Sequence, residues 1–151
     1  LTTRVKAIEL YGQPLTHATS EQSITILLAD EIDISRGDMI VKTAEAPEPK
    51  KQIEAMVCWL SETPMDRARK YLIRHTTRES KAMVAGIEYR VDVNSMEWVP
   101  ADKLAMNDIA KVAFKLAQPL FCDPYAENRG SGAFIVIDES NNNTVGAGMI
   151  L

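Results

Sequence analysis

The sequence predicts an all-β fold, and three observations support this prediction. Apolar residues alternate with polar ones at a period of two, most clearly where Ile87, Tyr89, Val91 and Val93 are separated by charged or polar residues. Proline, glycine and asparagine separate the alternating segments. No helical pattern of about ten residues or more lies between them, which disfavours parallel βαβ units. We therefore expect antiparallel strands arranged as a small barrel or sandwich.

Composition limits the class of protein. The chain has 151 residues, 46% of them hydrophobic and 25% charged, which is typical of an ordinary globular protein of one domain or two small ones. Its net charge of −4 disfavours a protein whose main task is to grip phosphate backbones. No apolar run approaches the roughly 20 residues of a membrane span, and no signal peptide opens the chain. We expect a cytoplasmic protein with no membrane partner.

The two cysteines allow three interpretations. Cys58 and Cys122 form no CxxC pair, so two free thiols in a reducing compartment is a simpler prediction than one disulfide. Cys122 with His75 is an alternative as a nucleophilic pair, since a catalytic thiol needs a polarising base. A buried cysteine and a structural histidine on a strand are favoured over that pair.

The first block of the chain predicts about three strands. Val5 and Ile8 open an alternating segment that ends at a turn over residues 11–14, and residues 23–30 alternate again. Residues 32–41 predict a turn at 36–38 followed by a short strand. Three strands bury too little apolar surface to be stable alone. We expect this block to be part of a larger barrel whose beginning is missing.

A linker and a second β block follow. Residues 43–51 hold two prolines, four charged residues and no large apolar side chain, which predicts a linker. Residues 103–109 are a weak candidate for a helical turn. The strand at 55–60 is apolar on both faces, which indicates a central position, and Gly146 and Gly148 indicate a bulge or close backbone approach. The expected strands lie at 55–60, 71–77, 87–93, 112–116, 133–138 and 144–150.

The motifs of common enzyme sites are absent. No glycine is followed by lysine, no glycine-rich turn opens a helix, and the two histidines belong to no zinc-site spacing. We therefore predict no catalytic residue, no bound cofactor and no metal in this chain. A basic run is interspersed with Glu62, Asp66 and Glu79, so a mixed-charge surface is favoured over a phosphate site; the run comprises Arg67, Arg69, Lys70, Arg74, Arg78 and Lys81.

One loop stands out as a candidate recognition site. It begins at Gln118 and reaches Gly132, and loops of that length in a compact domain are often functional. The alternative is a structural corner fixed by Pro119 and Pro124. Its recognition chemistry is concentrated in Asp123, Tyr125, Glu127, Asn128 and Arg129.

Three stretches together resemble one family. They are IDISRGDMI at 32–40, YLIRHTT with IEYRVDVN at 71–77 and 87–94, and QPLFCDPYAENRGSGAFIVID with TVGAGMI between 118 and 150. They resemble the region after the GTPase domain in the large, GTP-binding subunit of sulfate adenylyltransferase, a relative of elongation factor Tu. RGD, HTT and TVGAG are shared with translation factors, whereas DPYAENR and RVDVN resemble the sulfate-activating branch more specifically. The resemblance covers nearly the whole chain.

The resemblance implies a fold and a set of partners. Residues 1–42 would be part of an elongation-factor-Tu-like second-domain barrel, 43–51 a linker, and 52–151 a complete third-domain β-barrel. In this family, GTP hydrolysis by a preceding GTPase domain is coupled to formation of adenosine 5′-phosphosulfate from ATP and sulfate, which a small subunit catalyses. This chain lacks the phosphate loop and the Asn-Lys-x-Asp motif, so GTP and Mg²⁺ are expected only in the GTPase domain of the whole protein. The expected partners are that domain and the small catalytic subunit, as a heterodimer.

The resemblance also implies a role for the loop. In such proteins the barrels help convert nucleotide state into interface geometry, so the loop residues named above are candidates for a domain or subunit contact. Arg129 would pair with a carboxylate and Tyr125 would be a buried aromatic anchor. A second set of candidates comprises His75, Thr76 and Thr77.

Two alternatives remain open at this point. A translation-factor-type barrel pair that binds aminoacyl-tRNA would look similar. The net negative charge and the DPYAENR segment disfavour it, and we therefore expect no nucleic-acid partner. A stand-alone interaction module is disfavoured by the incomplete first barrel, whose exposed strand edges would invite aggregation.

Overall fold

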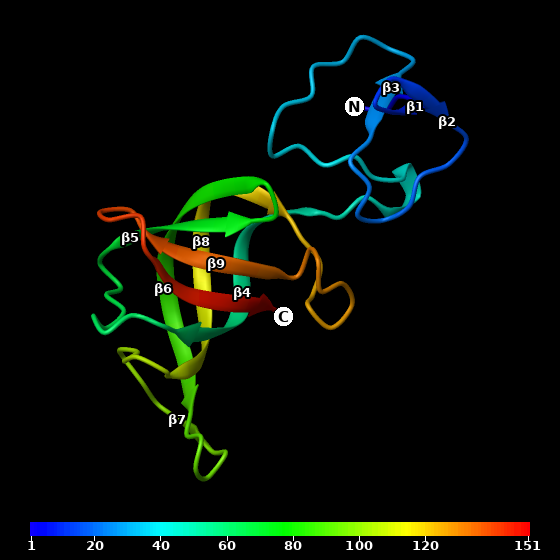
Figure 1. The fold of residues 1–151 in the computed structure, drawn as a ribbon. Helices are drawn as coiled ribbons and strands as arrows, with labels where there is room; N and C mark the ends of the chain where they lie inside the picture. The colour runs from blue at the N-terminus through cyan, green and yellow to red at the C-terminus, as the bar shows by residue number, and fades with distance from the viewer. The chain divides into compact units, whose positions relative to one another are not determined.

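The computed structural model describes residues 1–151, which form two compact units, Leu1–Ser35 and Arg36–Leu151 (Figure 1). The first unit is a three-stranded antiparallel sheet in the order β2-β1-β3. Its residues are all exposed or half-buried, so this sheet encloses no buried core of its own. A turn at Tyr11 and Gly12, both with positive φ, joins the first two strands. The strands are β1 (Val5–Leu10), β2 (Gln13–Leu15) and β3 (Thr25–Leu28).

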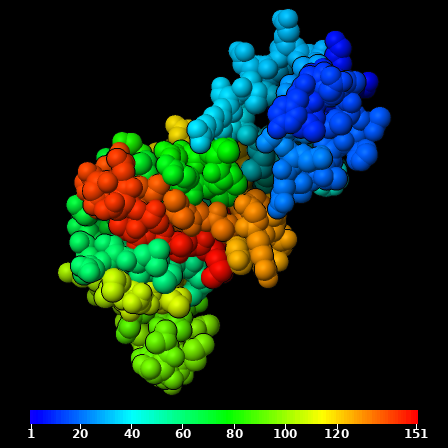
Figure 2. Space-filling model, in the orientation of Figure 1, coloured from blue at the N-terminus to red at the C-terminus, as the bar shows by residue number.

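The second unit is a closed antiparallel barrel. Its sheet has the order β5-β9-β10-β4-β8-β6-β7, and pairing of β5 with β6 closes six of these strands into a ring. The remaining strand, β7, extends β6 in a hairpin that protrudes from the barrel (Figures 1 and 2). The all-β fold class is thus confirmed. The strands are β4 (Pro49–Trp59), β5 (Lys70–His75), β6 (Arg78–Val91), β7 (Trp98–Val99), β8 (Ile109–Phe121), β9 (Ala133–Asp138) and β10 (Thr144–Ile150).

The barrel interior is filled by alternate side chains of each strand. In β4, Ala55, Val57 and Trp59 point inward and are buried, whereas Met56 and Cys58 point outward and are half-buried. Aromatic rings meet edge to face across the core, with centroids 5.6 Å apart for Trp59–Tyr71 and 5.8 Å for Phe114–Phe134. Strand β4 lies between β10 and β8, so its predicted central position is confirmed.

Glycines in β10 allow close packing, as TVGAG predicted. A Cβ atom on Gly148 would lie only 2.3 Å from Cζ of Phe134, so that ring occupies the space of the missing side chain. A β-bulge lies between Thr144 and Gly146. The strands predicted at 133–138 and 144–150 are observed with those bounds.

Several predicted boundaries are wrong. The strand predicted at 71–77 ends at His75, because Thr76 and Thr77 form a tight turn with Thr76 at φ 51°. The strand predicted at 87–93 is the end of the longer β6, whose bulges interrupt the period of two. The predicted loop at 118–132 begins later, since β8 continues to Phe121.

Other differences lie between the strands. No strand follows the turn at Arg36 and Gly37, and residues 103–109 contain a turn at 106–107 rather than helix. The segment predicted as a linker holds a 3-10 turn, Thr43–Glu45, and the first residues of β4. The domain boundaries at 42 and 52 remain predictions. The structure has no helix that is long and apolar enough to cross a membrane.

Candidate functional site

The loop at residues 122–132 is anchored to the barrel by its backbone. The N–H of Tyr125 donates to the carbonyl of Ile150 at 2.8 Å, and the N–H of Ile150 donates to the carbonyl of Gly132 at 2.8 Å. A Cβ on Gly132 would lie 2.4 Å from Cα of Tyr125, so only glycine allows this approach. The loop is therefore joined to the end of β10 rather than extended into solvent.

A carboxylate holds the loop together internally. The side chain of Asp123 accepts a hydrogen bond from the Ser131 hydroxyl, and another from Nδ2 of Asn128 at 3.3 Å. The N–H groups of Glu127 and Asn128 both donate to the carbonyl of Pro124 at 3.0 Å. These bonds cross the loop and give it a defined shape, with Glu127, Asn128 and Arg129 exposed on its surface.

His75 contacts this loop from the buried side. Its side chain is 1% exposed, and Nε2 lies 2.6 Å from the carbonyl oxygen of Ser131. A carbonyl only accepts, so Nε2 carries the proton and donates. Any part that His75 plays in a contact with another domain or subunit is therefore indirect, through the position of the loop.

The structure brings the two predicted sets of residues together. Thr76 and Tyr125 both line an open groove of about 590 Å³ on the outside of the barrel. The Arg129 guanidinium lies over the Tyr125 ring, 5.9 Å from its centroid, which is cation–π geometry. Thr77 is exposed in the turn next to Thr76. The contact roles of these residues remain predictions.

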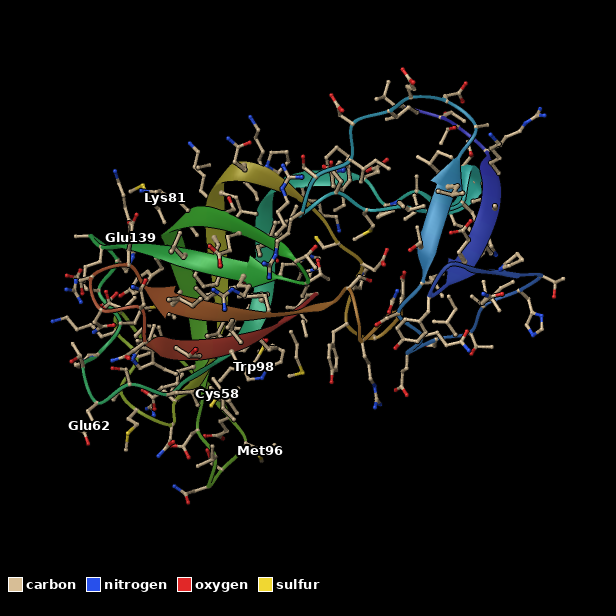
Figure 3. The ribbon with its side chains drawn as sticks, turned by 45° about the horizontal axis from the view of Figure 1, so that its top comes forward. Cys58, Glu62, Lys81, Met96, Trp98 and Glu139 are labelled. Carbon is tan, nitrogen blue, oxygen red and sulfur yellow. The ribbon has the colours of Figure 1, made fainter.

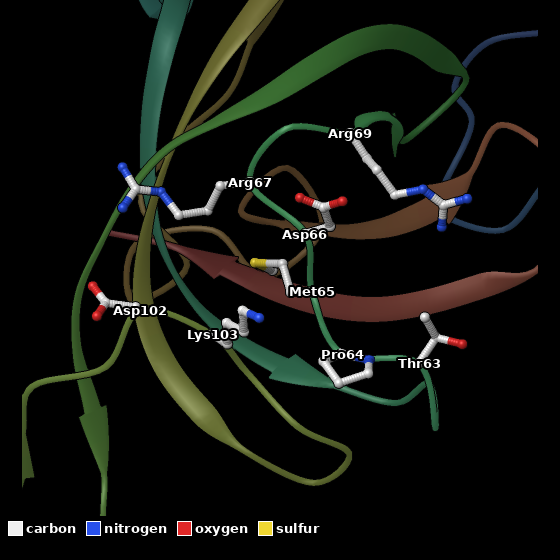
Figure 4. A pocket seen from close by; sticks show the side chains of 8 residues that line it. All are labelled: Thr63, Pro64, Met65, Asp66, Arg67, Arg69, Asp102 and Lys103. Carbon is white, nitrogen blue, oxygen red and sulfur yellow. The ribbon is translucent and has the colours of Figure 1, made fainter.

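The opposite end of the barrel has a pocket lined by basic side chains, and two of its arginines are bonded to other groups of this chain. A hollow of about 660 Å³ is bordered by Arg67, Arg69, Asp102 and Lys103 (Figure 4). Arg67 Nη2 donates to the carbonyl of Ala85 at 3.2 Å. Arg69 Nη1 lies 3.1 Å from Oδ2 of Asp138, whose pKa is lowered mainly by hydrogen bonds from Ser140, with a further contribution from Arg69.

Other members of the basic run have acidic or aromatic neighbours as well. Arg74 donates to Glu79 at 2.7 Å, Lys81 forms an ion pair with Glu139, and Arg78 lies over the Phe121 ring. These contacts make the basic run a mixed-charge surface, as predicted from the sequence, rather than a cluster of unpaired cations that could bind a phosphate.

The structure gives no support for a catalytic pair of a cysteine with His75. Both are free thiols, and Cys122 is buried, which raises its pKa and keeps the thiol protonated. The proton-bearing Nε2 of His75 is engaged with Ser131. No group of three or more His, Cys, Asp or Glu side chains is placed to hold a metal ion.

Sequence reasoning missed the groove itself. Its floor is made by outward-facing apolar residues of neighbouring strands, among them Met56, Cys58, Ile135 and Met149. One signal was present, since the strand at 55–60 is apolar on both faces. That signal was attributed to a central position in the sheet, and it did not reveal which outward residues meet across strands.

The chain belongs to the family described as GTP-eEF1A C-terminal domain-like, whose sequence profile matches residues 52–151. The fold agrees with this, because a structure of sup35 complexed with GMPPNP superposes with a TM-score of 0.87 at 13% identity, over 100% of this chain and 37% of that one. At this identity the likeness concerns the fold alone.

Curated relatives carry the family name that the sequence resemblance suggested. A protein named sulfate adenylyltransferase subunit 1 from Saccharophagus degradans is 45% identical over 99% of this chain. Another of that name from Bacteroides fragilis is 43% identical over 97% of it. The chain spans 32% and 31% of the length of these two relatives. It is thus similar to about a third of each.

Proposed function

We propose that this chain is the barrel region of a GTP-binding subunit of sulfate adenylyltransferase. In this proposal the whole protein couples GTP hydrolysis to formation of adenosine 5′-phosphosulfate, which a separate small subunit catalyses in the cytoplasm. The observation that carries the proposal is the 45% identity over 99% of the chain to a relative named as subunit 1 of that enzyme. GTP and Mg²⁺ belong to the GTPase domain of the whole protein, and no residue of this chain is assigned to them.

In this proposal, the role of this chain is to form domain or subunit contacts that depend on whether the GTPase domain holds GTP or GDP. Such coupling needs contacts that differ between two states of the protein. The loop at 122–132 supports this part, because its backbone is fixed to β10 while Glu127, Asn128 and Arg129 are exposed. A fixed backbone with exposed polar side chains presents a contact surface of constant shape.

An Arg129→Ala variant of the full-length protein tests the loop. Removal of the guanidinium should weaken the coupling of GTP hydrolysis to adenosine 5′-phosphosulfate synthesis by about tenfold, as expected for one charge-assisted contact. The measurement compares GTP hydrolysis with and without the small subunit. Arg67→Ala is the matched control, since Arg67 is an exposed arginine at the opposite end of the barrel. Unchanged coupling and unchanged affinity in Arg129→Ala would remove the loop from the mechanism.

The second candidate function is binding of aminoacyl-tRNA by a translation-factor-type barrel pair. The family model that matches residues 52–151, described as GTP-eEF1A C-terminal domain-like, favours it. The net charge of −4 and the ion pairs of Arg69, Arg74 and Lys81 disfavour it, since RNA binding relies on cations available to phosphates. Salt-sensitive binding of tRNA by the full-length protein would support this candidate instead.

A further inference from the structure

The outside of the barrel carries a continuous apolar face. Directly paired residues of antiparallel strands point to the same side of a sheet, so the strand register identifies neighbours on its outer surface. One row crosses six strands from β9 to β7, and every member is apolar or a cysteine; it comprises Ile135, Ala147, Cys58, Ile109, Val91 and Trp98. The adjacent row comprises Ala133, Met149, Met56, Lys111 and Tyr89. We call these two rows the apolar face.

The apolar face is accessible rather than covered. Trp98 is 71% exposed and stacks on Tyr89 with centroids 4.6 Å apart, and Met149 is 43% exposed. Figure 3 labels Cys58 and Trp98 on this side of the barrel, with Met96 further along the protruding hairpin. The groove of about 590 Å³ hollows the β9–β10–β4 end of the face. An apolar surface that extends over several strands and is hollowed in this way is typical of a protein contact.

The rest of the barrel exterior is different. On the middle of β4 the outward positions are Gln52 and Glu54, and on β8 the outward Lys115 lies beyond Lys111. On β4 and β8 the outward apolar side chains therefore concentrate toward one end, whereas on β6 the outward Met83 lies apart from them. If the outward apolar residues served only to favour strand formation, they would be spread along the strands. Their concentration indicates a further role.

Charge on the apolar face limits the kind of partner. Lys111 Nζ lies 2.7 Å from Glu88 and 3.0 Å from Glu54, and these two carboxylates, Glu88 first, raise the pKa of Lys111. At the other end, Arg74 is paired with Glu79. The apolar face thus offers no excess of cations to nucleic acid or to anionic lipid. These side chains are three carboxylates and two cations, which suits a protein surface that is apolar at its centre and neutral or basic at its edge.

We infer that the apolar face binds the second subunit of the enzyme. The inference rests on the proposed function, because the relatives named subunit 1 imply at least one further subunit. Apolar surfaces of this kind suit a stable partner better than a transient one. Trp98 and Tyr89 at one end and Met149 with Met56 at the other are the anchors, since large aromatic and methionine side chains dominate such contacts.

The chain offers a matched pair of variants to test this inference. Met149→Lys places a charge in the apolar face, and Met83→Lys places the same charge on an outward residue of β6 that is 47% exposed and pairs with Lys70 and Lys115. With the full-length protein and the small subunit from the same organism, we expect Met149→Lys to weaken the complex by about tenfold or more. Met83→Lys should change the affinity by less than about twofold. Trp98→Ala, on the exposed hairpin, should weaken the complex without disturbing the barrel.

A second measurement needs no substitution. Cys58 is half-buried within the apolar face, whereas Cys122 is buried in the core. Maleimide labelling of the wild-type protein, located by peptide mapping, should modify Cys58 in the free protein and spare it in the complex. Cys122 should be labelled slowly in both.

The outcomes separate this inference from the proposed function. The inference would be overturned, and the proposed function left intact, by the following combination of results. The wild-type proteins associate and GTP stimulates synthesis, but Met149→Lys and Met83→Lys bind the small subunit with equal affinity, and Cys58 is still labelled in the complex. An effect of Met149→Lys only on self-association, or only on GTP hydrolysis by the large subunit alone, would assign the face to a second copy or to the protein's own GTPase domain, and would also overturn it. Failure of the wild-type proteins to associate or to respond to GTP would count against the proposed function itself.

Discussion

At the scale of single residues, the packing of the barrel requires glycine at two positions where no side chain would fit. Gly148 lies against the ring of Phe134, and Gly132 lies against the backbone of Tyr125. Neither glycine has a positive φ, so space rather than backbone conformation requires them. The sequence indicated close approach for the glycines of β10. It gave no way to identify Phe134 as the neighbour, because that contact depends on the register between β9 and β10.

A Gly148→Ala substitution should therefore destabilise the barrel. The added methyl group would have to displace the Phe134 ring, which is packed edge to face against Phe114, and overpacking of this kind costs about 1–3 kcal/mol in free energy of unfolding. Urea denaturation measures this change. Gly86→Ala is the control, because nothing lies within 4 Å of the position its Cβ would take. Equal stability of the two variants would contradict the packing described here.

At the scale of elements, the loop after β4 closes one end of the barrel through three side chains. Met65 is buried as a plug, and its N–H donates to the carbonyl of Leu104 at 2.9 Å. Trp59 Nε1 donates to the carbonyl of Thr63 at 2.8 Å. The Tyr71 hydroxyl accepts from the N–H of Asp66 at 2.9 Å and donates to its carbonyl at 3.2 Å. The polar groups of two core aromatic residues thus fix the loop.

Tyr71 should make the stability of this end of the barrel dependent on pH. Burial raises the pKa of its phenol above the ordinary value of 10.0. The folded state holds that proton more tightly than the unfolded state, so the associated stability is complete below about pH 10 and is lost as the pH rises through the folded pKa. Tyr71→Phe should lose about 0.5–1.5 kcal/mol at neutral pH and show a smaller further loss above pH 10.

Thermal denaturation between pH 7 and 11 measures both effects. Tyr11→Phe is the control, because Tyr11 is almost fully exposed. Parallel pH profiles for the wild type and Tyr71→Phe would show that the phenol does not carry this dependence.

Elements were predictable from the sequence where local signals agreed. The strands at 133–138 and 144–150 alternate cleanly and are separated by three asparagines, so both bounds were found. Thr76 and Thr77 are β-branched residues that favour strand, which concealed their turn. The bulges of β6 shift its alternation, so only its last part was recognised.

The candidate site was predictable only in part, for the same reason. The unusual composition of the loop at 122–132 is local, so Asp123 to Arg129 were identified as candidates. The support of the loop by His75 joins residues far apart in the chain, and the apolar face joins six strands in one register. Pairing over such distances is set by the closed barrel and is not visible in any short segment.

At the scale of the whole molecule, the barrel has two distinct candidate contact regions. The exposed side chains of the loop at 122–132 are polar, whereas the face over β9, β10, β4, β8, β6 and β7 is apolar. Tyr125 borders both, since it belongs to the loop and lines the groove. A module with two adjacent surfaces of different character is suited to contact two partners, and under the proposed function these would be the GTPase domain of the whole protein and another subunit.

The most direct test of the proposed function is synthesis of adenosine 5′-phosphosulfate by the full-length protein mixed with the small subunit, measured with and without GTP. We predict that the proteins co-elute and that GTP stimulates synthesis, while a non-hydrolysable GTP analogue does not sustain the stimulation. Synthesis that is indifferent to GTP, with no complex and with salt-sensitive tRNA binding in its place, would contradict the proposed function and favour a translation-factor role.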